Sequence, residues 1–214
     1  MSTVALIDYG SGNLRSAEKA LQKAASGLPR GPQVVTTDDP EVIAAAERVV
    51  LPGVGAFAAC MRALEGRAGV VEAMTEAVKE RGAAFLGICV GMQLLADRGL
   101  EFGATPGLGW IGGEVRRIEP DDAACKVPHM GWNSLTGEAR QPLFDRLPAG
   151  AHMYFTHSFA LYPEDEGDVA AWTDHGGRFC AAVTRGNVAG VQFHPEKSQA
   201  AGQRLLRSFL EWAP

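Results

Sequence analysis

The sequence predicts an α/β protein: an open, mostly parallel sheet with helices on both faces and additional mixed or antiparallel strands in the C-terminal half. In the first half, short runs rich in β-branched residues alternate with stretches of helical periodicity, which is typical of βαβ units. The runs are apolar throughout, as in strands covered on both faces. From residue 109 the pattern changes to closely spaced strand-like segments separated by Gly, Asp or Pro.

The elements expected in the first half follow from these patterns. Apolar residues at helical spacing predict a helix over residues 13–25. Buried strands are expected at residues 4–8, 34–36, 48–51 and 84–88, and Pro52-Gly53 is expected to end the third. Further helices are expected at residues 42–46, 56–65, 70–81 and 91–96.

The second half is predicted to hold mostly strands. They are expected at residues 110–118, 132–136, 152–161, 168–173, 179–184 and 188–193, followed by an amphipathic helix at 198–212. They are expected to extend the same sheet or to form a small second layer. Since no linker, low-complexity tract or repeat is present, residues 1–214 are expected to form a single domain.

Composition excludes several classes of protein. A hydrophobic share of 46% and a charged share of 21% are typical of globular chains, and a net charge of −5 with no basic face predicts no nucleic-acid partner. The N-terminus lacks a signal-peptide pattern, and no apolar run is long enough for a membrane span. The four cysteines form no CxxC pair, which favours reduced thiols and a cytoplasmic location.

Cys89 is a candidate nucleophile. It lies in GICVG (87–91), a G-x-nucleophile-x-G elbow between a predicted strand and a predicted helix, with Cys where hydrolases have Ser. Small flanking residues permit a strained turn, the helix N-terminus favours the thiolate, and the Val90 N–H is expected to face an oxyanion. A structural cysteine between two chance glycines fits this pattern equally well. Cys60, Cys125 and Cys180 have no comparable setting.

His194 is the candidate base for this nucleophile. It ends an apolar run that Pro195 stops at once, and Glu196 follows two residues on, where a carboxylate can fix the tautomer and stabilise the imidazolium. Taken alone, His194 is more simply a strand-end histidine, but the elbow and Glu196 together favour catalysis. No second histidine has metal-ligand spacing to it. His157 is expected to be structural or to line the site.

The loop after the third predicted strand, PGVGAF (52–57), is the candidate for the rest of an oxyanion hole. Glycines on both sides of Val54 permit unusual backbone angles, so the Gly53–Val54 peptide can offer an N–H to an oxyanion. Loop and elbow both follow parallel strands, at the edge where open α/β sheets bind ligands. A glycine-rich turn without a chemical role is the alternative. The pattern of a phosphate loop is absent.

Motifs spread along the chain carry a resemblance to a known family. They are DYGSGNLRS (8–16), PGVGAF (52–57), GICVGMQLL (87–95), GLGWIGGEVRRI (107–118), PHMGWN (128–133), YFTHSF (154–159) and QFHPEKS (192–198). Together they resemble the class I (triad) glutamine amidotransferases and, more specifically, the glutaminase subunits of imidazole glycerol phosphate synthases of histidine biosynthesis. The resemblance implies a flavodoxin-like sheet of the class I amidotransferase type.

The activity implied by this resemblance is hydrolysis of L-glutamine to glutamate and ammonia, with neither cofactor nor metal. Cys89 would attack the side-chain amide, and His194, held by Glu196, would protonate the departing ammonia and then activate water against a glutamyl thioester. The N–H of Val90 and the Gly53–Val54 peptide would hold the oxyanion.

The resemblance also implies which residues bind the substrate. Gly53, Gly55 and Gln93 match positions that contact the glutamine, and the backbone around Ser158 and Phe159 matches the strand that grips it. Phe159 stands where the family leads us to expect Tyr.

The implied partner is a (β/α)₈ cyclase subunit, which forms a heterodimer with the glutaminase and receives its ammonia. The cyclase converts a phosphoribosyl-formimino precursor into imidazole glycerol phosphate and an aminoimidazole carboxamide ribotide. Asn13, Trp132, Tyr154 and Lys197 match residues at that interface. Trp and Tyr are common interface anchors, whereas core packing and a solvated charge are the alternatives.

Three other functions stay open from sequence alone. The first is a glutaminase that serves a different synthase. The second is a cysteine peptidase or chaperone-like member of the same broad fold. The third is a non-catalytic subunit with an unused triad. Gln93 and the PGVG motif argue against the peptidase.

Overall fold

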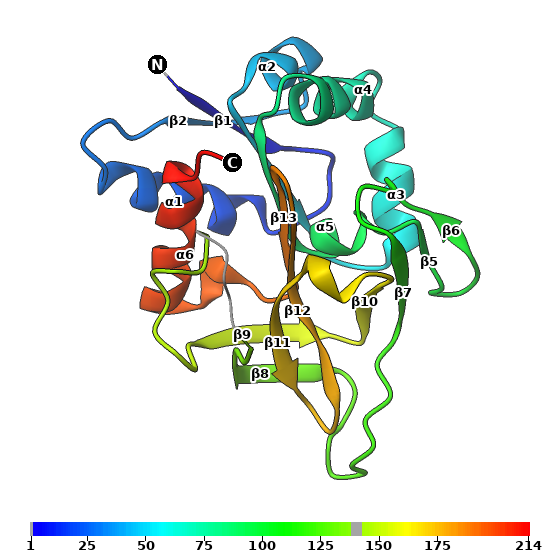
Figure 1. The fold of residues 1–214 in the computed structure, drawn as a ribbon. Coiled ribbons are helices and arrows are strands. Elements are labelled where there is room, and N and C mark those ends of the chain that lie inside the picture. Colours follow the sequence, from blue (N-terminus) through cyan, green and yellow to red (C-terminus); the bar gives the residue numbers. More distant parts are fainter. Residues whose placement is uncertain (1, 138–142) are drawn as a thin grey trace.

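A computed structural model describes residues 2–137 and 143–214, and its largest unit is a seven-stranded sheet (Figure 1). The strands of this sheet are β1 (Thr3–Ile7), β2 (Gln33–Thr37), β3 (Arg48–Gly53), β4 (Ala84–Cys89), β11 (Val169–Asp174), β12 (Arg178–Arg185) and β13 (Val188–Val191). Their order is β11-β12-β13-β4-β3-β1-β2. From β13 to β2 every pair is parallel, and β12 and β11 extend the sheet antiparallel. The predicted mostly parallel sheet is therefore confirmed.

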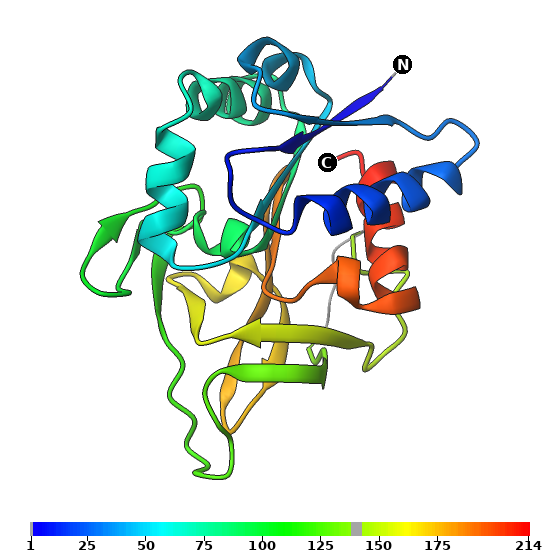
Figure 2. The ribbon, with the colours of Figure 1, turned by 180° about the vertical axis from the view of Figure 1, so that it is seen from behind.

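Helices cover both faces of this sheet, as predicted. They are α1 (Leu14–Ser26), α2 (Pro40–Ala45), α3 (Phe57–Glu65), α4 (Val70–Thr75), α5 (Val90–Gln93) and α6 (Gln199–Glu211). Helices α1 and α6 lie on one side, whereas α3, α4 and α5 lie on the other (Figure 1). The view from behind shows α1 and α6 side by side (Figure 2), and each buries an apolar stripe, around Leu21 in α1 and Phe209 in α6.

Two smaller sheets flank the large one. Strands β10 (Phe159–Pro163), β7 (Gly113–Arg117), β5 (Arg98–Gly99) and β6 (Thr105–Pro106) form the first, in that order. Strands β8 (His129–Ser134) and β9 (His152–His157) pair antiparallel as the second, which lies across the lower part of β11 and β12 in both views. Single 3₁₀ turns occupy Glu166–Asp168 and Pro195–Lys197. The C-terminal strands therefore both extend the main sheet and build further layers.

Two expected boundaries next to the candidate nucleophile were wrong. Strand β3 runs through Pro52 to Gly53, because its pairing with β4 continues as far as Gly53 opposite Cys89. The helix expected at residues 91–96 is only the single turn α5. After it, bonds tighten to i→i+3, and the carbonyls of residues 94–96 accept N–H groups from the loop at residues 108–111 instead.

Three further expectations need correction. The helix expected at residues 70–81 is α-helical only to Thr75 and continues as a π-helix over Glu76–Glu80, closed by an i→i+5 bond from Arg81 N to Glu76 O. The strand expected at residues 152–161 is divided at Ser158 between β9 and β10, which join different sheets. Strands β5 and β6, of two residues each, were not predicted, since so short a pairing leaves no periodicity to detect.

Within the described ranges, none of the helices combines the length and the apolar character that a membrane span requires.

Candidate active site

Cys89 lies at the end of β4 in a strained backbone conformation. Its φ of 55° and ψ of −111° place it in a region that residues with a side chain rarely adopt. A Cβ on Gly87 would lie 2.5 Å from the carbonyl oxygen of Gly91, and a Cβ on Gly91 would overlap the carbonyl oxygen of Leu51. Both glycines are therefore required by close backbone approach, as expected for a nucleophile elbow.

The glycine-rich loop leaves the sheet beside the elbow. Gly53 is the register partner of Cys89, and a Cβ on Gly53 would lie 2.7 Å from the backbone nitrogen of Gly91. The Ser11 hydroxyl donates to the Val54 carbonyl at 2.8 Å, and the Cys60 thiol donates to the same oxygen at 3.4 Å. The peptide after Val54 is thus held by neighbouring segments.

His194 and Glu196 form a buried pair beside the nucleophile. His194 Nδ1 lies 2.8 Å from Glu196 Oε1, and the two side chains are 2% and 4% exposed. Burial lowers the pKa of His194, but interactions with Cys89 and then with Glu196 more than offset this effect and raise it to about 9. Nε2 of His194 is buried and makes no hydrogen bond within the described residues, so it is free to act on a reacting group.

A cavity of about 310 Å³ connects most of the predicted site residues. It is lined by Val54, Gly55, Cys89, Val90, Gln93, Glu101, Thr156, His157, Ser158, Phe159, His194 and Lys197. Two predicted catalytic-site residues do not line the cavity themselves. Glu196 contacts the lining residue His194, and Gly53 pairs with the lining residue Cys89. Segments from the β3, β4, β9 and β13 ends therefore meet at one place.

Hydrogen bonds tie the far wall of the cavity to the nucleophile. Gln93 Nε2 donates to the carbonyl of Phe159 at 2.8 Å and to Gln192 Oε1 at 3.0 Å. Gln192 Nε2 in turn donates to the Cys89 sulfur at 3.7 Å. The segment expected to grip the substrate is thus connected to the elbow.

Three polar residues of this site were missed from the sequence, and one of them, Thr156, lines the cavity from β9. Glu101 lines the cavity, and its Oε2 accepts a hydrogen bond from the N–H of Phe57 at 2.9 Å. A single glutamate after a two-residue strand carries no sequence pattern. Gln192 had a usable signal, because it lies two residues before His194 in the same motif, but its contact with Cys89 depends on the sheet.

Three of the four residues assigned to a partner interface lie together. Trp132 and Tyr154 pack edge to face with ring centroids 6.0 Å apart, and Lys197 Nζ lies 5.7 Å from the Tyr154 ring centroid. Trp132 is 48% exposed although it is a large aromatic residue. The fourth, Asn13, precedes α1, and its carbonyl accepts the N–H groups of Ser16 and Ala17.

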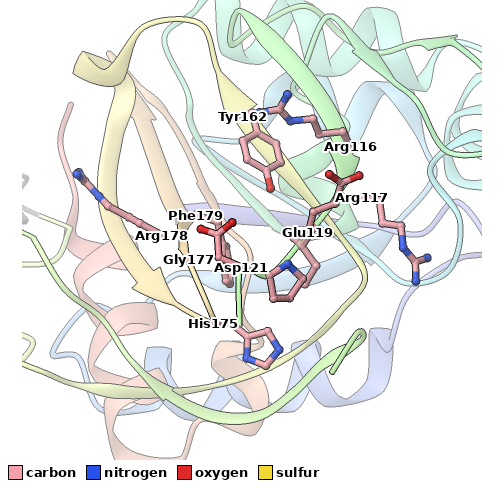
Figure 3. A pocket seen from close by; sticks show the side chains of 11 residues that line it. Arg116, Arg117, Glu119, Asp121, Tyr162, His175, Gly177, Arg178 and Phe179 are labelled. Carbon is pink, nitrogen blue, oxygen red and sulfur yellow. The ribbon is translucent and has the colours of Figure 1, made fainter. Parts of the chain in front are cut away.

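A larger cavity of about 390 Å³ lies elsewhere, beside β7, β10 and β12 (Figure 3). The side chains of Arg117 and Arg178 point away from each other there, and Arg116 stacks on the ring of Tyr162 at 4.0 Å. It contains no cysteine or serine nucleophile, so it is the weaker candidate for covalent chemistry. In the described parts of the chain, no group of His, Cys, Asp or Glu side chains is arranged to hold a metal ion.

Comparison with known proteins identifies the family of the chain. The family described as Glutamine amidotransferase class-I matches residues 5–212. A protein named imidazole glycerol phosphate synthase subunit HisH from Caulobacter vibrioides is 59% identical over 214 residues, covering 100% of both chains. The HisH protein of Rhodospirillum rubrum is 56% identical over 212 residues, covering 99% of each chain.

A solved structure shares the fold at low sequence identity. It is described as a glutamine amidotransferase, and it matches with a TM-score of 0.70 and 22% identity, covering 97% of each chain. At this identity the likeness supports the fold alone. On the family match and the full-length relatives, the chain belongs to the class I glutamine amidotransferases and, within them, to the HisH subunits of imidazole glycerol phosphate synthase.

Proposed function

We propose that this chain hydrolyses L-glutamine to glutamate and ammonia through a Cys89–His194–Glu196 triad. The observation that carries the proposal is a strained cysteine in one cavity with a histidine whose Nδ1 lies 2.8 Å from a buried carboxylate. The Cys89 thiolate attacks the side-chain amide carbon, and the resulting oxyanion collapses as the C–N bond breaks. His194 supplies the proton for the departing ammonia, and a glutamyl thioester is left on the sulfur.

The second half of the reaction uses the same base. His194 Nε2 takes a proton from water as the water attacks the thioester carbonyl, and glutamate leaves as the Cys89 sulfur is restored. The N–H of Val90 and the Gly53–Val54 peptide are the proposed oxyanion donors, supported by the register of Gly53 opposite Cys89.

The proposed substrate contacts surround this sulfur. Gly53, Gly55, Gln93 and the backbone of Ser158 and Phe159 would hold the glutamine, and all except Gly53 line the cavity. The Glu101 carboxylate is a further candidate for a substrate contact. It lines the cavity, and a carboxylate suits the α-ammonium group of an amino acid.

The proposed partner is a (β/α)₈ cyclase that receives the ammonia and completes histidine-pathway chemistry. Full-length relatives named as subunits of imidazole glycerol phosphate synthase support a partner, and so does the exposed Trp132 beside Tyr154. Lys197 both lines the cavity and lies over Tyr154, so the proposed interface adjoins the proposed site. Asn13 is included in the proposed interface because it matches an interface position of the family.

We further propose that residues 1–214 act as one amidotransferase domain in the cytoplasm. The family match over residues 5–212 supports the single domain, and four free cysteines fit a reducing compartment.

Activity is proposed to depend on the partner. The glycines around Val54 permit a change in the orientation of the Gly53–Val54 peptide. The bonds from Ser11 and Cys60 to the Val54 carbonyl hold the following Val54–Gly55 peptide in the chain alone, so a partner can change the loop by releasing them.

The test measures ammonia release from glutamine by the chain alone and by its complex with the cyclase and the cyclase ligand. Strong stimulation in the complex, lost in Cys89→Ala while binding persists, is the expected result. Equal rates in both states would contradict the dependence on the partner. Hydrolysis retained by Cys89→Ala would contradict the triad.

A further inference from the structure

We propose that Gln192 is a further catalytic residue, whose side-chain N–H donates a hydrogen bond to the Cys89 sulfur and stabilises its thiolate. The inference rests on the proposed function, because it assigns a role in the same reaction. It starts from the 3.7 Å separation between Gln192 Nε2 and Cys89 Sγ.

The fold fixes the position of Gln192 beside Cys89. Strand β13 runs parallel to β4 with Val191 opposite Ile88, so Gln192 lies beside Cys89 where both strands end. The Gln192 backbone N–H donates to the carbonyl of Ala181 on β12 at 2.8 Å, and the residue is fully buried. A buried amide must satisfy both ends with partners, and the sulfur is the partner of its nitrogen.

The orientation of the amide follows from its neighbours. The carbonyl oxygen of Phe159 is only an acceptor, so Gln93 must present its NH₂ group to it. The same NH₂ group lies 3.0 Å from Gln192, which must therefore turn its oxygen toward Gln93. The NH₂ group of Gln192 is left facing the sulfur, where it acts as a donor.

The elbow itself gives the sulfur little electrostatic support. Helix α5 is a single turn, Val90–Gln93, so the helix dipole behind the sulfur is much smaller than that of the longer helix expected from sequence. Cys89 is buried, so its sulfur must find hydrogen-bond donors within the protein rather than in water. A hydrogen bond to an ionised group is about twice as strong as one between neutral groups, so the Gln192 N–H stabilises the thiolate more than the thiol.

Two substitutions separate this role from a structural one. Gln192→Met removes the donor with a side chain of similar length, and Gln192→Glu keeps the oxygen that Gln93 binds but replaces the NH₂ group. Thr184→Val is the matched control, because Thr184 is a buried residue on β12 whose hydroxyl has no hydrogen bond among the described residues. Alkylation of Cys89 by iodoacetamide is followed against pH by peptide-resolved mass spectrometry, and kcat and KM are measured in the cyclase complex.

The expected result is a midpoint of the alkylation profile about one pH unit higher in both Gln192 variants, and a kcat about ten- to a hundredfold lower with little change in KM. Thr184→Val should match the parent chain in both. In the unsubstituted protein, the NMR signal of the Gln192 side-chain amide should shift with pH, and the midpoint of that shift should match the midpoint of the alkylation profile. This readout does not depend on how a variant folds.

An alkylation profile and kcat unchanged within about twofold, or an amide resonance insensitive to the state of the sulfur, would overturn the assignment. Because alkylation and the resonance are measured without glutamine, this failure is distinct from failure of the proposed function, in which the parent complex releases no ammonia.

Discussion

His129 Nδ1 lies 3.1 Å from His157 Nε2 inside the protein, next to the wall of the candidate cavity. His157 Nδ1 donates to the carbonyl of Phe159 at 2.9 Å, so its Nε2 must accept from His129. His129 Nε2 is then left to accept from the amide of Asn133 at 3.1 Å. This pattern uses one proton on each ring, which is the neutral form of both, and the chain of hydrogen bonds ends on the oxygen that also binds Gln93.

Acid should destabilise the fold through this pair. Burial, with smaller contributions from neighbouring histidines including His175, lowers the pKa of His129 to about 4 and that of His157 to about 3, although the bond to Phe159 opposes the latter shift. An unfolded histidine titrates near 6.5, so the unfolded state binds more protons between these values. The stabilisation is complete above pH 6.5 and is lost as the pH falls toward 4.

Urea unfolding from pH 7.5 to 4.5 measures this effect. The free energy of unfolding should drop by on the order of a few kcal/mol. The drop should shrink in His129→Gln, and His152→Gln is the control because His152 is an exposed residue of the same sheet. An equal drop in the His129 variant would show that the pair is not responsible.

Glu196→Gln should impair chemistry more than substrate binding. A neutral amide cannot stabilise the His194 imidazolium, so the pKa of His194 should fall from its raised value of about 9 and kcat should drop by about a hundredfold or more. Because that folded-state pKa lies above the unfolded value, the pair stabilises the fold below pH 6.5 and loses this effect as the pH rises through about 9.

NMR titration of His194 with steady-state kinetics checks both statements. Unchanged titration in Glu196→Gln would mean that Cys89 alone sets the charge of the histidine.

Gly91→Ala should destabilise the fold and abolish activity. The added Cβ would overlap the carbonyl of Leu51, so β3 or α5 must shift, at a cost of about 2 kcal/mol or more. Gly112→Ala is the matched control, because its Cβ would meet Glu164 at an ordinary 3.4 Å. Thermal unfolding of both variants gives the comparison, and equal stability would mean that the elbow is less tightly packed than the distances indicate.

Trp132→Ala should weaken cyclase binding by about ten- to a hundredfold and leave the stability of the chain nearly unchanged. Its ring is 48% exposed and packs on Tyr154, which suits an anchor that is completed by a partner. Phe102→Ala is the control, because this aromatic residue is 96% exposed and does not line the candidate cavity. Isothermal titration with the cyclase would contradict the assignment if both variants bound like the parent chain.

The parallel half of the fold was predictable because its strands are apolar runs with clear helical stretches between them. Boundaries failed where tertiary contacts decide them. Strand β3 is extended by its pairing with Cys89 on β4, and α5 ends early because the loop at residues 108–111 binds the carbonyls of residues 94–96 that follow it. The division at Ser158 likewise depends on which sheet each neighbouring segment joins.

The candidate site was predictable where residues stand in motifs. Cys89, His194 and Glu196 could be chosen from local patterns, but only the pairing of β13 with β4 brings the 192–194 segment to the cysteine. Glu101 stands in no pattern, and its place in the cavity depends on the position of α3, whose first N–H it accepts. The hydrogen bonds that orient Gln192 cross three segments and leave no signal in one sequence.

The most direct test of the account is the mass spectrum of the cyclase complex quenched in acid during turnover of glutamine. The account predicts a glutamyl adduct on the peptide that carries Cys89, absent from Cys89→Ala and accumulating in Glu196→Gln if the second step becomes slower than the first. Ammonia release without an adduct on that peptide, or an adduct on another cysteine, would contradict it.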